Sequence, residues 1–103
     1  MIYYKEHLID EGVIIAICDE NLIDKVLEDG DLFMDISSYS DFYKGELIDP
    51  NADLKLDLRE FNSANVVGSE SVAFAIKNFL ISKDNVKMVG KVPYAHSYKV
   101  KKV

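Results

Sequence analysis

The sequence has little cysteine and no long hydrophobic run. Cys18 is the single cysteine of the 103 residues, which excludes an internal disulfide and fits a reducing compartment. The longest apolar run, residues 12–18, is far shorter than the roughly 18 residues that a membrane-spanning helix needs. The first six residues lack the basic start and long apolar body of a signal peptide. These absences predict a cytoplasmic protein that does not contact a membrane.

The chain also lacks internal repeats, low-complexity tracts and linkers rich in proline, glycine or serine. Its composition, 49% hydrophobic, is ordinary for a globular protein and argues against wholesale disorder. We therefore predict that residues 1–103 form a single domain with one modest core.

Positive charge is scarce over most of the chain and is concentrated at its end. Residues 1–84 hold all 18 acidic residues and seven of the 12 basic ones, a net charge of −11. Residues 85–103 hold five lysines and no acidic residue, a net charge of +5. Because attraction to phosphate depends on clustered positive charge, the acidic body excludes broad contact with nucleic acid. The basic end indicates either a local contact with phosphate or an acidic protein, or only a solvated strand face.

Runs of β-branched and aromatic residues at both ends of the chain predict two β-hairpins. The turn-forming residues 10–12 join the runs of the first hairpin, and Pro93-Tyr94 joins those of the second. The first hairpin's second run is apolar nearly throughout, as in a strand buried on both faces. The four predicted strands are residues 2–9, 12–18, 86–92 and 95–100.

The segment after the first hairpin is predicted as helix, strand and loop in turn. Asp19 offers an N-cap for a helix that ends at Asp29-Gly30. A short strand over residues 32–36 follows. Residues 37–45 mix aromatic and turn-forming residues, which favours an ordered loop or a single helical turn.

Two further helices are predicted before the second hairpin. Asp49-Pro50 suits the start of a helix that runs to Phe61, although the alternation of Leu54, Leu56 and Leu58 also suits a strand. The clearest helix begins at Gly68-Ser69, and its apolar face comprises Val72, Ala73, Ile76, Phe79 and Leu80. Two hairpins that flank a helical middle predict an α+β domain. We expect one mainly antiparallel sheet of about five strands, with two or three helices on one face.

Four short motifs, taken in order along the chain, resemble an archaeal family of unknown function. They are CDE at 18–20, FYKGE at 42–46, ANVVG at 64–68 and VPYA at 92–95. The set is similar to the family catalogued as domain of unknown function 424, and the resemblance covers nearly the whole chain. It implies a cytoplasmic archaeal protein of one domain, and it implies no activity. The family's last motif is closer to Pro-His-Ala-Gln, so Tyr94 stands in place of its histidine, which weakens a catalytic role there.

Candidate catalytic residues and metal ligands are few. Cys18 is predicted just before a helix N-terminus, where the helix dipole can lower the pKa of a thiol. The neighbouring Asp19 and Glu20 would raise that pKa instead, and a free cysteine more often fills a core. His7 and His96 show none of the ligand spacings typical of a metal site, so we predict neither a metal nor a cofactor.

The alternative candidate site is a pocket where residues 64–68 lead into the clearest predicted helix, since a helix N-terminus exposes N–H groups to anions. The stretch has one glycine and no P-loop lysine, so helix capping is the more frequent reason for Gly68-Ser69. Asn65 could cap, turn the chain or hydrogen-bond a ligand. If the end of strand 12–18 and the start of this helix converge, the chain could be a small enzyme or ligand-binding protein. Its pocket would then contain Cys18, Asp19, Asn65 and Gly68.

Aromatic residues that alternate with basic ones near the C-terminus favour a binding surface. In a strand, Tyr94, His96 and Tyr98 lie on one side, and Ala95, Ser97 and Lys99 on the other. Such rings stack on bases, but they equally form a half-buried sheet face. The same two interpretations apply to the aromatic stretch Tyr39, Phe42 and Tyr43 beside Lys44.

The leading hypothesis is a non-catalytic binding module that contacts RNA, an RNA–protein assembly or an acidic protein through its C-terminal segment. Its candidate binding residues are Tyr94, His96, Tyr98, Lys87, Lys91, Lys99, Lys101 and Lys102. A third interpretation is a homo-oligomer that pairs through the terminal strand.

Overall fold

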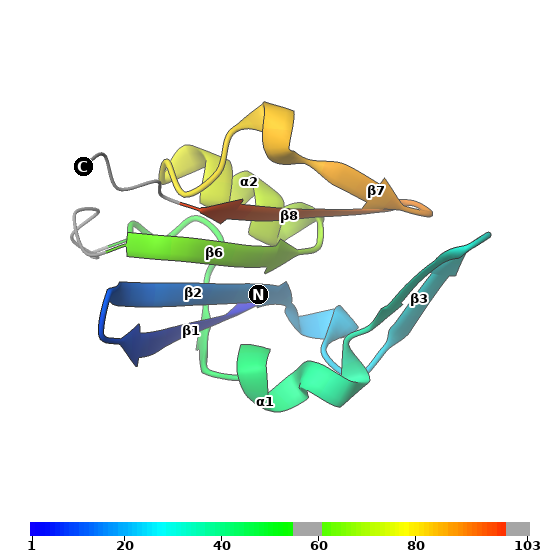
Figure 1. The fold of residues 1–103 in the computed structure, drawn as a ribbon, viewed down its shortest axis with the longest axis horizontal. Coiled ribbons are helices and arrows are strands. Elements are labelled where there is room, and N and C mark those ends of the chain that lie inside the picture. Colours follow the sequence, from blue (N-terminus) through cyan, green and yellow to red (C-terminus); the bar gives the residue numbers. More distant parts are fainter. Residues whose placement is uncertain (55–60, 99–103) are drawn as a thin grey trace.

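A computed structural model describes residues 1–54 and 61–98, and the predicted first hairpin forms its N-terminal part (Figure 1). Strand β1 (Ile2–Ile9) pairs antiparallel with β2 (Gly12–Asp19), with Tyr4 opposite Ile17. Every residue of β2 from Ile15 to Asp19 is buried, as the apolar run indicated. The hairpin therefore supplies β2, one of the two central strands of the main sheet.

Within the described residues, six strands form one mixed sheet in the order β5-β1-β2-β6-β8-β7. The strands beyond the first hairpin are β5 (Glu46–Ile48), β6 (Phe61–Val67), β7 (Lys87–Val89) and β8 (Val92–Tyr98). β2 and β6 run parallel, and the other neighbouring pairs are antiparallel. The prediction of an α+β domain is confirmed, but the sheet has more strands than expected and is not purely antiparallel.

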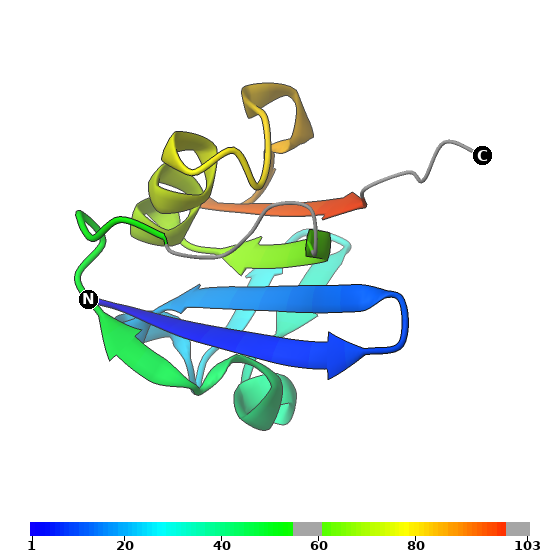
Figure 2. The same cartoon turned by 90° about the vertical axis from the view of Figure 1, so that its left-hand side faces the viewer.

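Helix α2 (Ser69–Lys77) covers one face of this sheet. Its buried side chains Val72, Phe74 and Ala75 pack with Ile15 and Ile17 of β2 in the larger core cluster. Because side chains alternate along a strand, the intervening residues of β2 and β6 point to the opposite face. Figure 2 shows α2 beside β6 and β8, with α1 (Ser40–Tyr43) away from it, beside β1.

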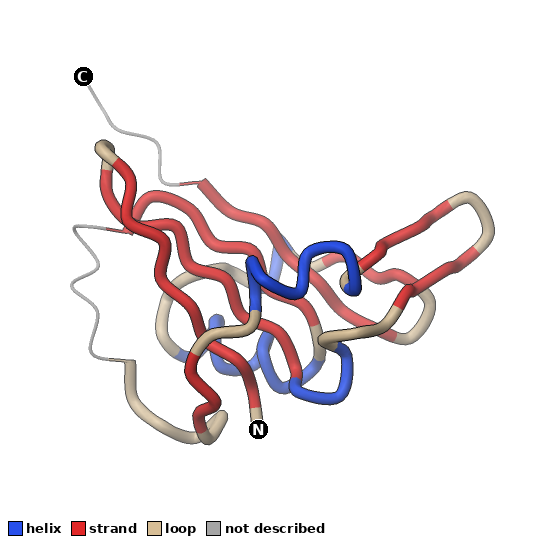
Figure 3. Tube along the Cα trace, turned by 90° about the horizontal axis from the view of Figure 1, so that it is seen from below, coloured by secondary structure: helices blue, strands red, loops and turns tan. Residues whose placement is uncertain are grey.

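The opposite face is covered over only part of its area. A second cluster forms there around the buried Cys18, Leu22, Ile36 and Val67. The elements that supply its cover are two 3-10 turns, Glu20–Leu22 and Ser37–Tyr39, helix α1, and the hairpin of β3 (Val26–Asp29) and β4 (Leu32–Asp35). Seen from below, this hairpin projects beyond the sheet (Figure 3).

Two predictions about helices are wrong. The helix expected after Asp19 is a single 3-10 turn followed by β3, because the Asp19 side chain caps α2 rather than a helix of its own. The expected placement of all helices on one face is also wrong, since α1 lies on the face opposite α2. Among the described residues, no helix is long and apolar enough to cross a membrane.

The expectations for residues 49–61 and for the second hairpin also need correction. Phe61 begins β6 instead of ending a helix, and Leu56 and Leu58 lie outside the described residues. The second hairpin forms, but its turn contains Gly90, whose φ of 61° suits glycine. Pro93 and Tyr94 therefore lie inside β8, where Pro93 is opposite Met88.

Candidate functional site

Strand pairing aligns side chains from four strands in rows across the sheet face opposite α2. One row contains Lys5, Ala16, Asn65 and His96, and the next contains His7, Ile14, Ser63 and Tyr98. Helix α1 packs beside β1 at one end of these rows (Figure 2), whereas His96 and Tyr98 at the β8 end are exposed. We call the surface formed by Ile14, Asn65, His96 and Tyr98 the open face.

Two aromatic rings of β8 stand exposed on the open face. The ring centroids of His96 and Tyr98 are 4.4 Å apart at an angle of 59°, and Tyr98 is 70% exposed. Tyr94 belongs to the same side of the strand but is half-buried against the second core cluster. On the other side of β8, Ala95 is buried and the Ser97 hydroxyl donates to the Leu80 carbonyl. The open face thus presents two rings in contact with each other and with solvent.

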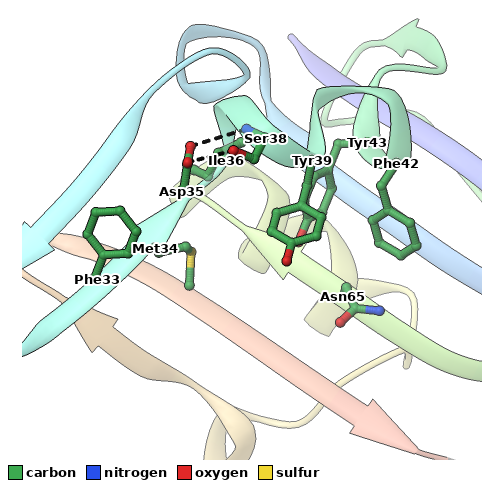
Figure 4. Close-up of a pocket in the computed structure, with 9 residues that line it drawn as sticks. All are labelled: Phe33, Met34, Asp35, Ile36, Ser38, Tyr39, Phe42, Tyr43 and Asn65. Atoms are coloured by element: carbon green, nitrogen blue, oxygen red, sulfur yellow. Dashed lines mark hydrogen bonds between the residues drawn. The ribbon is translucent and has the colours of Figure 1, made fainter.

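A cavity of 690 Å³ adjoins the open face (Figure 4). It lies between β4, α1 with the preceding 3-10 turn, and β6. The close-up shows Tyr39, Phe42 and Tyr43 on one side and Phe33 and Met34 on the other, and Asn65 extends from β6. Tyr39 and Phe33 are 64% and 65% exposed, so both rings remain accessible from solvent. Aromatic walls with one amide group are suited to a flat ligand that carries hydrogen-bonding groups at its edge.

The aromatic wall of the cavity is held in place from β1. The His7 ring stacks on Phe42 at 4.6 Å and 11°, and its Nε2 is 2.8 Å from the Phe42 carbonyl oxygen. Lys5 Nζ donates to the Asp41 carbonyl oxygen at 2.6 Å. Phe42 then meets Tyr43 edge to face at 5.1 Å. Helix α1 is too short to be stable alone, so these contacts with β1 position its rings.

The opposite rim of the cavity is organised by the Asp35 carboxylate. It accepts hydrogen bonds from both hydroxyl groups of Ser37 and Ser38 and from the Ser38 N–H at 3.1 Å. These hydrogen bonds lower the pKa of Asp35 below its ordinary value. Burial raises the pKa of the Tyr43 phenol to about 12, with smaller contributions from Cys18 and Tyr39. At neutral pH the site therefore contains an anionic carboxylate and a protonated phenol.

The end of β2 and the start of α2 converge, as the predicted pocket requires, and Asp19 contacts Gly68 there. Asp19 Oδ1 accepts from the Ser71 N–H at 2.8 Å and from the Ser71 hydroxyl at 2.7 Å, and Oδ2 accepts from the Glu70 N–H at 3.3 Å. Asp19 is buried, and its carboxylate caps α2 although β2 lies far from α2 along the sequence. The protein's own carboxylate thus occupies the helix N-terminus that an anion could have used.

The other two residues of that candidate pocket lie on the opposite face of the sheet. Cys18 is fully buried in the second core cluster, and Asn65 borders the cavity. Burial, and then the charge of Asp19, raise the pKa of the Cys18 thiol to about 12, so the thiol stays protonated at neutral pH. The four residues therefore form two pairs on opposite faces of the sheet: Asp19 with Gly68, and Cys18 with Asn65. Of the four, only Asn65 lines the aromatic cavity.

The candidate lysines do not form one patch in the described part of the chain. Lys87 pairs with Tyr94 at the start of β8, and Lys91 lies in the preceding turn. Both are exposed, at the end of the strand away from Tyr98. Lys99, Lys101 and Lys102 lie outside the described residues. Over residues 1–54 and 61–98, no cluster of three or more histidine, cysteine or acidic side chains could hold a metal.

Sequence reasoning considered the aromatic residues of α1 but missed the cavity's other side. Phe33 and Met34 sit in a short strand whose pattern indicates only a strand. Their approach to α1 depends on the path of the β3–β4 hairpin, which local patterns do not specify. Asn65 was a candidate, but the register of β6 was needed to place it opposite His96.

Comparison with known proteins agrees with this fold. No curated protein matches the sequence. A crystal structure of an uncharacterized conserved protein from Methanopyrus kandleri has the same fold, with a TM-score of 0.72 and 22% identity over 94% of this chain and 90% of that one. The model of the family described as protein of unknown function (DUF424) matches residues 7–100. The chain therefore belongs to the DUF424 family.

Proposed function

We propose that the protein is a non-catalytic module that binds an unpaired segment of RNA across β6 and β8. The observation that carries this proposal is the pair of exposed, touching rings of His96 and Tyr98 on the open face. Bases stack on exposed aromatic rings, and each such stack is typically worth about 1–3 kcal/mol. Tyr94 is half-buried, so it supports β8 rather than contacting the strand of RNA.

Two further observations support binding rather than catalysis. The only thiol is buried and has a raised pKa, which makes it a poor nucleophile. The lysines of residues 85–103 precede and follow the rings along the chain, where they suit the phosphates on either side of stacked bases. The acidic body restricts the contact to this strand.

The test is the binding of a 12-nucleotide single-stranded RNA, measured by fluorescence anisotropy at low salt. The double variant His96→Ala/Tyr98→Ala should lose at least tenfold in affinity, because two stacking surfaces are removed. Leu8→Ala is the control, since Leu8 is 83% exposed and lies on the side of β1 that contains Ile2 and Tyr4. Equal binding of a duplex of the same sequence, or unchanged affinity in the double variant, would contradict the proposal.

A further inference from the structure

We propose that the cavity beside the open face receives one unstacked nucleobase that carries an exocyclic amino group, adenine being the best fit. The inference rests on the proposed RNA binding and specifies which part of the RNA the cavity recognises. It is carried by the arrangement of an aromatic wall, an opposite side formed by Phe33 and Met34, one amide and one carboxylate around a solvent-accessible space.

The dimensions and walls of the cavity suit a flat heteroaromatic ring. Its volume of 690 Å³ lies within the range common for small-ligand sites, about 300–1,000 Å³. Tyr39 and Phe42 face Phe33 and Met34 across the space (Figure 4). The stack with His7 fixes the orientation of Phe42, so this ring is in place before a ligand arrives. A ring that is already held in place favours a planar ligand, because that ring loses little side-chain entropy on binding.

The polar groups of the cavity point to a base rather than a purely apolar ring. The Asn65 carboxamide offers a donor and an acceptor side by side, the pair that reads an adenine through its amino group and ring nitrogen. In the part of the chain that the structure describes, no other side chain hydrogen-bonds this amide. The Asp35 carboxylate on the rim can only accept hydrogen bonds, which favours an amino edge over a carbonyl edge.

The phosphates of the RNA must remain outside the cavity. Its described lining contains no lysine or arginine, and Asp35 would repel a phosphate. The sheet register gives the exit path, because Asn65 lies directly opposite His96 and Tyr98 follows on the same side of β8. A base in the cavity therefore leaves its neighbour at the exposed ring pair, so that the two sites bind consecutive nucleotides.

The experiment is an NMR titration of the full chain with free nucleosides, which tests the cavity without the phosphate backbone. Adenosine should shift the amide signals of Met34, Tyr39 and Asn65, and inosine, in which a carbonyl oxygen replaces the amino group, should bind about tenfold more weakly. Asn65→Ala and the exposed Tyr39→Ala should each weaken adenosine binding by about tenfold. Asn62→Ala is the matched control, because Asn62 is in the same strand but does not border the cavity.

The outcomes separate this inference from the proposed function. Inosine binding as tightly as adenosine, or adenosine binding unchanged in Asn65→Ala, would overturn the inference. RNA binding that depends on His96 and Tyr98 but not on Asn65, with no nucleoside shifts, would overturn it and leave the RNA-binding module intact. Nucleoside binding at Asn65 without any RNA binding would refute the proposed function and support a nucleoside site.

Discussion

Gly68 and Asp19 are fitted together more closely than any other residue type at position 68 would allow. Gly68 has a φ of 108°, which L side chains rarely adopt, and a Cβ added there would lie 2.2 Å from Asp19 Cγ. Asp19 cannot withdraw without leaving the Ser71 N–H and hydroxyl unpaired in a buried position. The close approach thus ties the last residue of β2 to the first turn of α2.

Gly68→Ala should therefore destabilise the protein by about 3 kcal/mol, because backbone strain and loss of the cap act together. Gly90→Ala is the matched control, since Gly90 also has a positive φ, 61°, but no atom lies within 4 Å of an added Cβ. It should cost only about 1 kcal/mol, the strain alone. Urea unfolding measures both differences. Equal losses for the two variants would show that the approach of Asp19 contributes nothing.

The sequence identifies several residues of the two sites, but it does not predict which of them lie together in the fold. The sequence places Cys18, Asp19, Asn65 and Gly68 near the end of one strand and the start of one helix, which predicts a single group. Side-chain alternation separates them, since Asp19 points toward α2 whereas Cys18 and Asn65 point to the other face. That His96 and Tyr98 lie on the same side of β8 follows from side-chain alternation within that strand alone. This part of the prediction therefore does not depend on the register of β6.

The end of helix α2 has a geometry that usually requires glycine. The Leu80 N–H donates to the Ala75 carbonyl at 2.9 Å and the Phe79 N–H to the Ile76 carbonyl at 3.1 Å, the two bonds of a Schellman motif. Phe79 occupies the left-handed position of this motif with a φ of 63°, and its side chain is 80% exposed. The helix end therefore carries strain that its exposed ring hardly offsets.

Phe79→Gly should stabilise the protein by about 1 kcal/mol, because glycine adopts this conformation without steric cost. Phe79→Ala removes the same ring but keeps a Cβ, so it should give no comparable gain. Thermal or urea unfolding of the two variants separates relief of strain from loss of the ring. A destabilised Phe79→Gly would mean that the ring contributes packing that outweighs the strain.

The elements that sequence patterns predicted are those stabilised by local signals. β1, β2 and α2 have clear periodicity, and all three are present. β6 was missed because Asn62, Ser63 and Asn65 interrupt its apolar pattern, although most of the strand is buried between β2 and β8. A strand flanked on both sides by partners from distant parts of the chain does not need a strong pattern of its own.

Charges of opposite sign are separated along the sequence. Residues 85–103 carry +5 and residues 1–84 carry −11. In the fold, however, Gly90 N–H donates to Asp29 Oδ2 at 3.1 Å, which places acidic β3 against the turn that contains Lys91. Positive potential near the β7–β8 turn is therefore partly cancelled by this neighbour.

The affinity for RNA should therefore depend on salt concentration less than it does in nucleic-acid-binding proteins that neutralise many phosphates. With single strands each neutralised phosphate contributes about 0.7 to the slope of log K against log salt concentration, so five lysines give a slope no steeper than about −3.5. Lys87→Gln and Lys91→Gln should each reduce its magnitude by at most about 0.7. Lys83→Gln, in the exposed 3-10 turn Lys83–Asn85, is the control. A slope much steeper than −3.5 would point to a binding surface other than β8.

The parallel pairing of β2 with β6 has a consequence for how the chain reaches this fold. The two strands at the centre of the sheet pair residues almost fifty positions apart, such as Ile14 with Ser63. All the elements that form the cavity's aromatic walls belong to the connection between them. Folding must close this long loop before the centre of the sheet exists, and such topologies fold slowly. Neither half of the chain contains a complete sheet, so fragments that end within the connection should not fold by themselves.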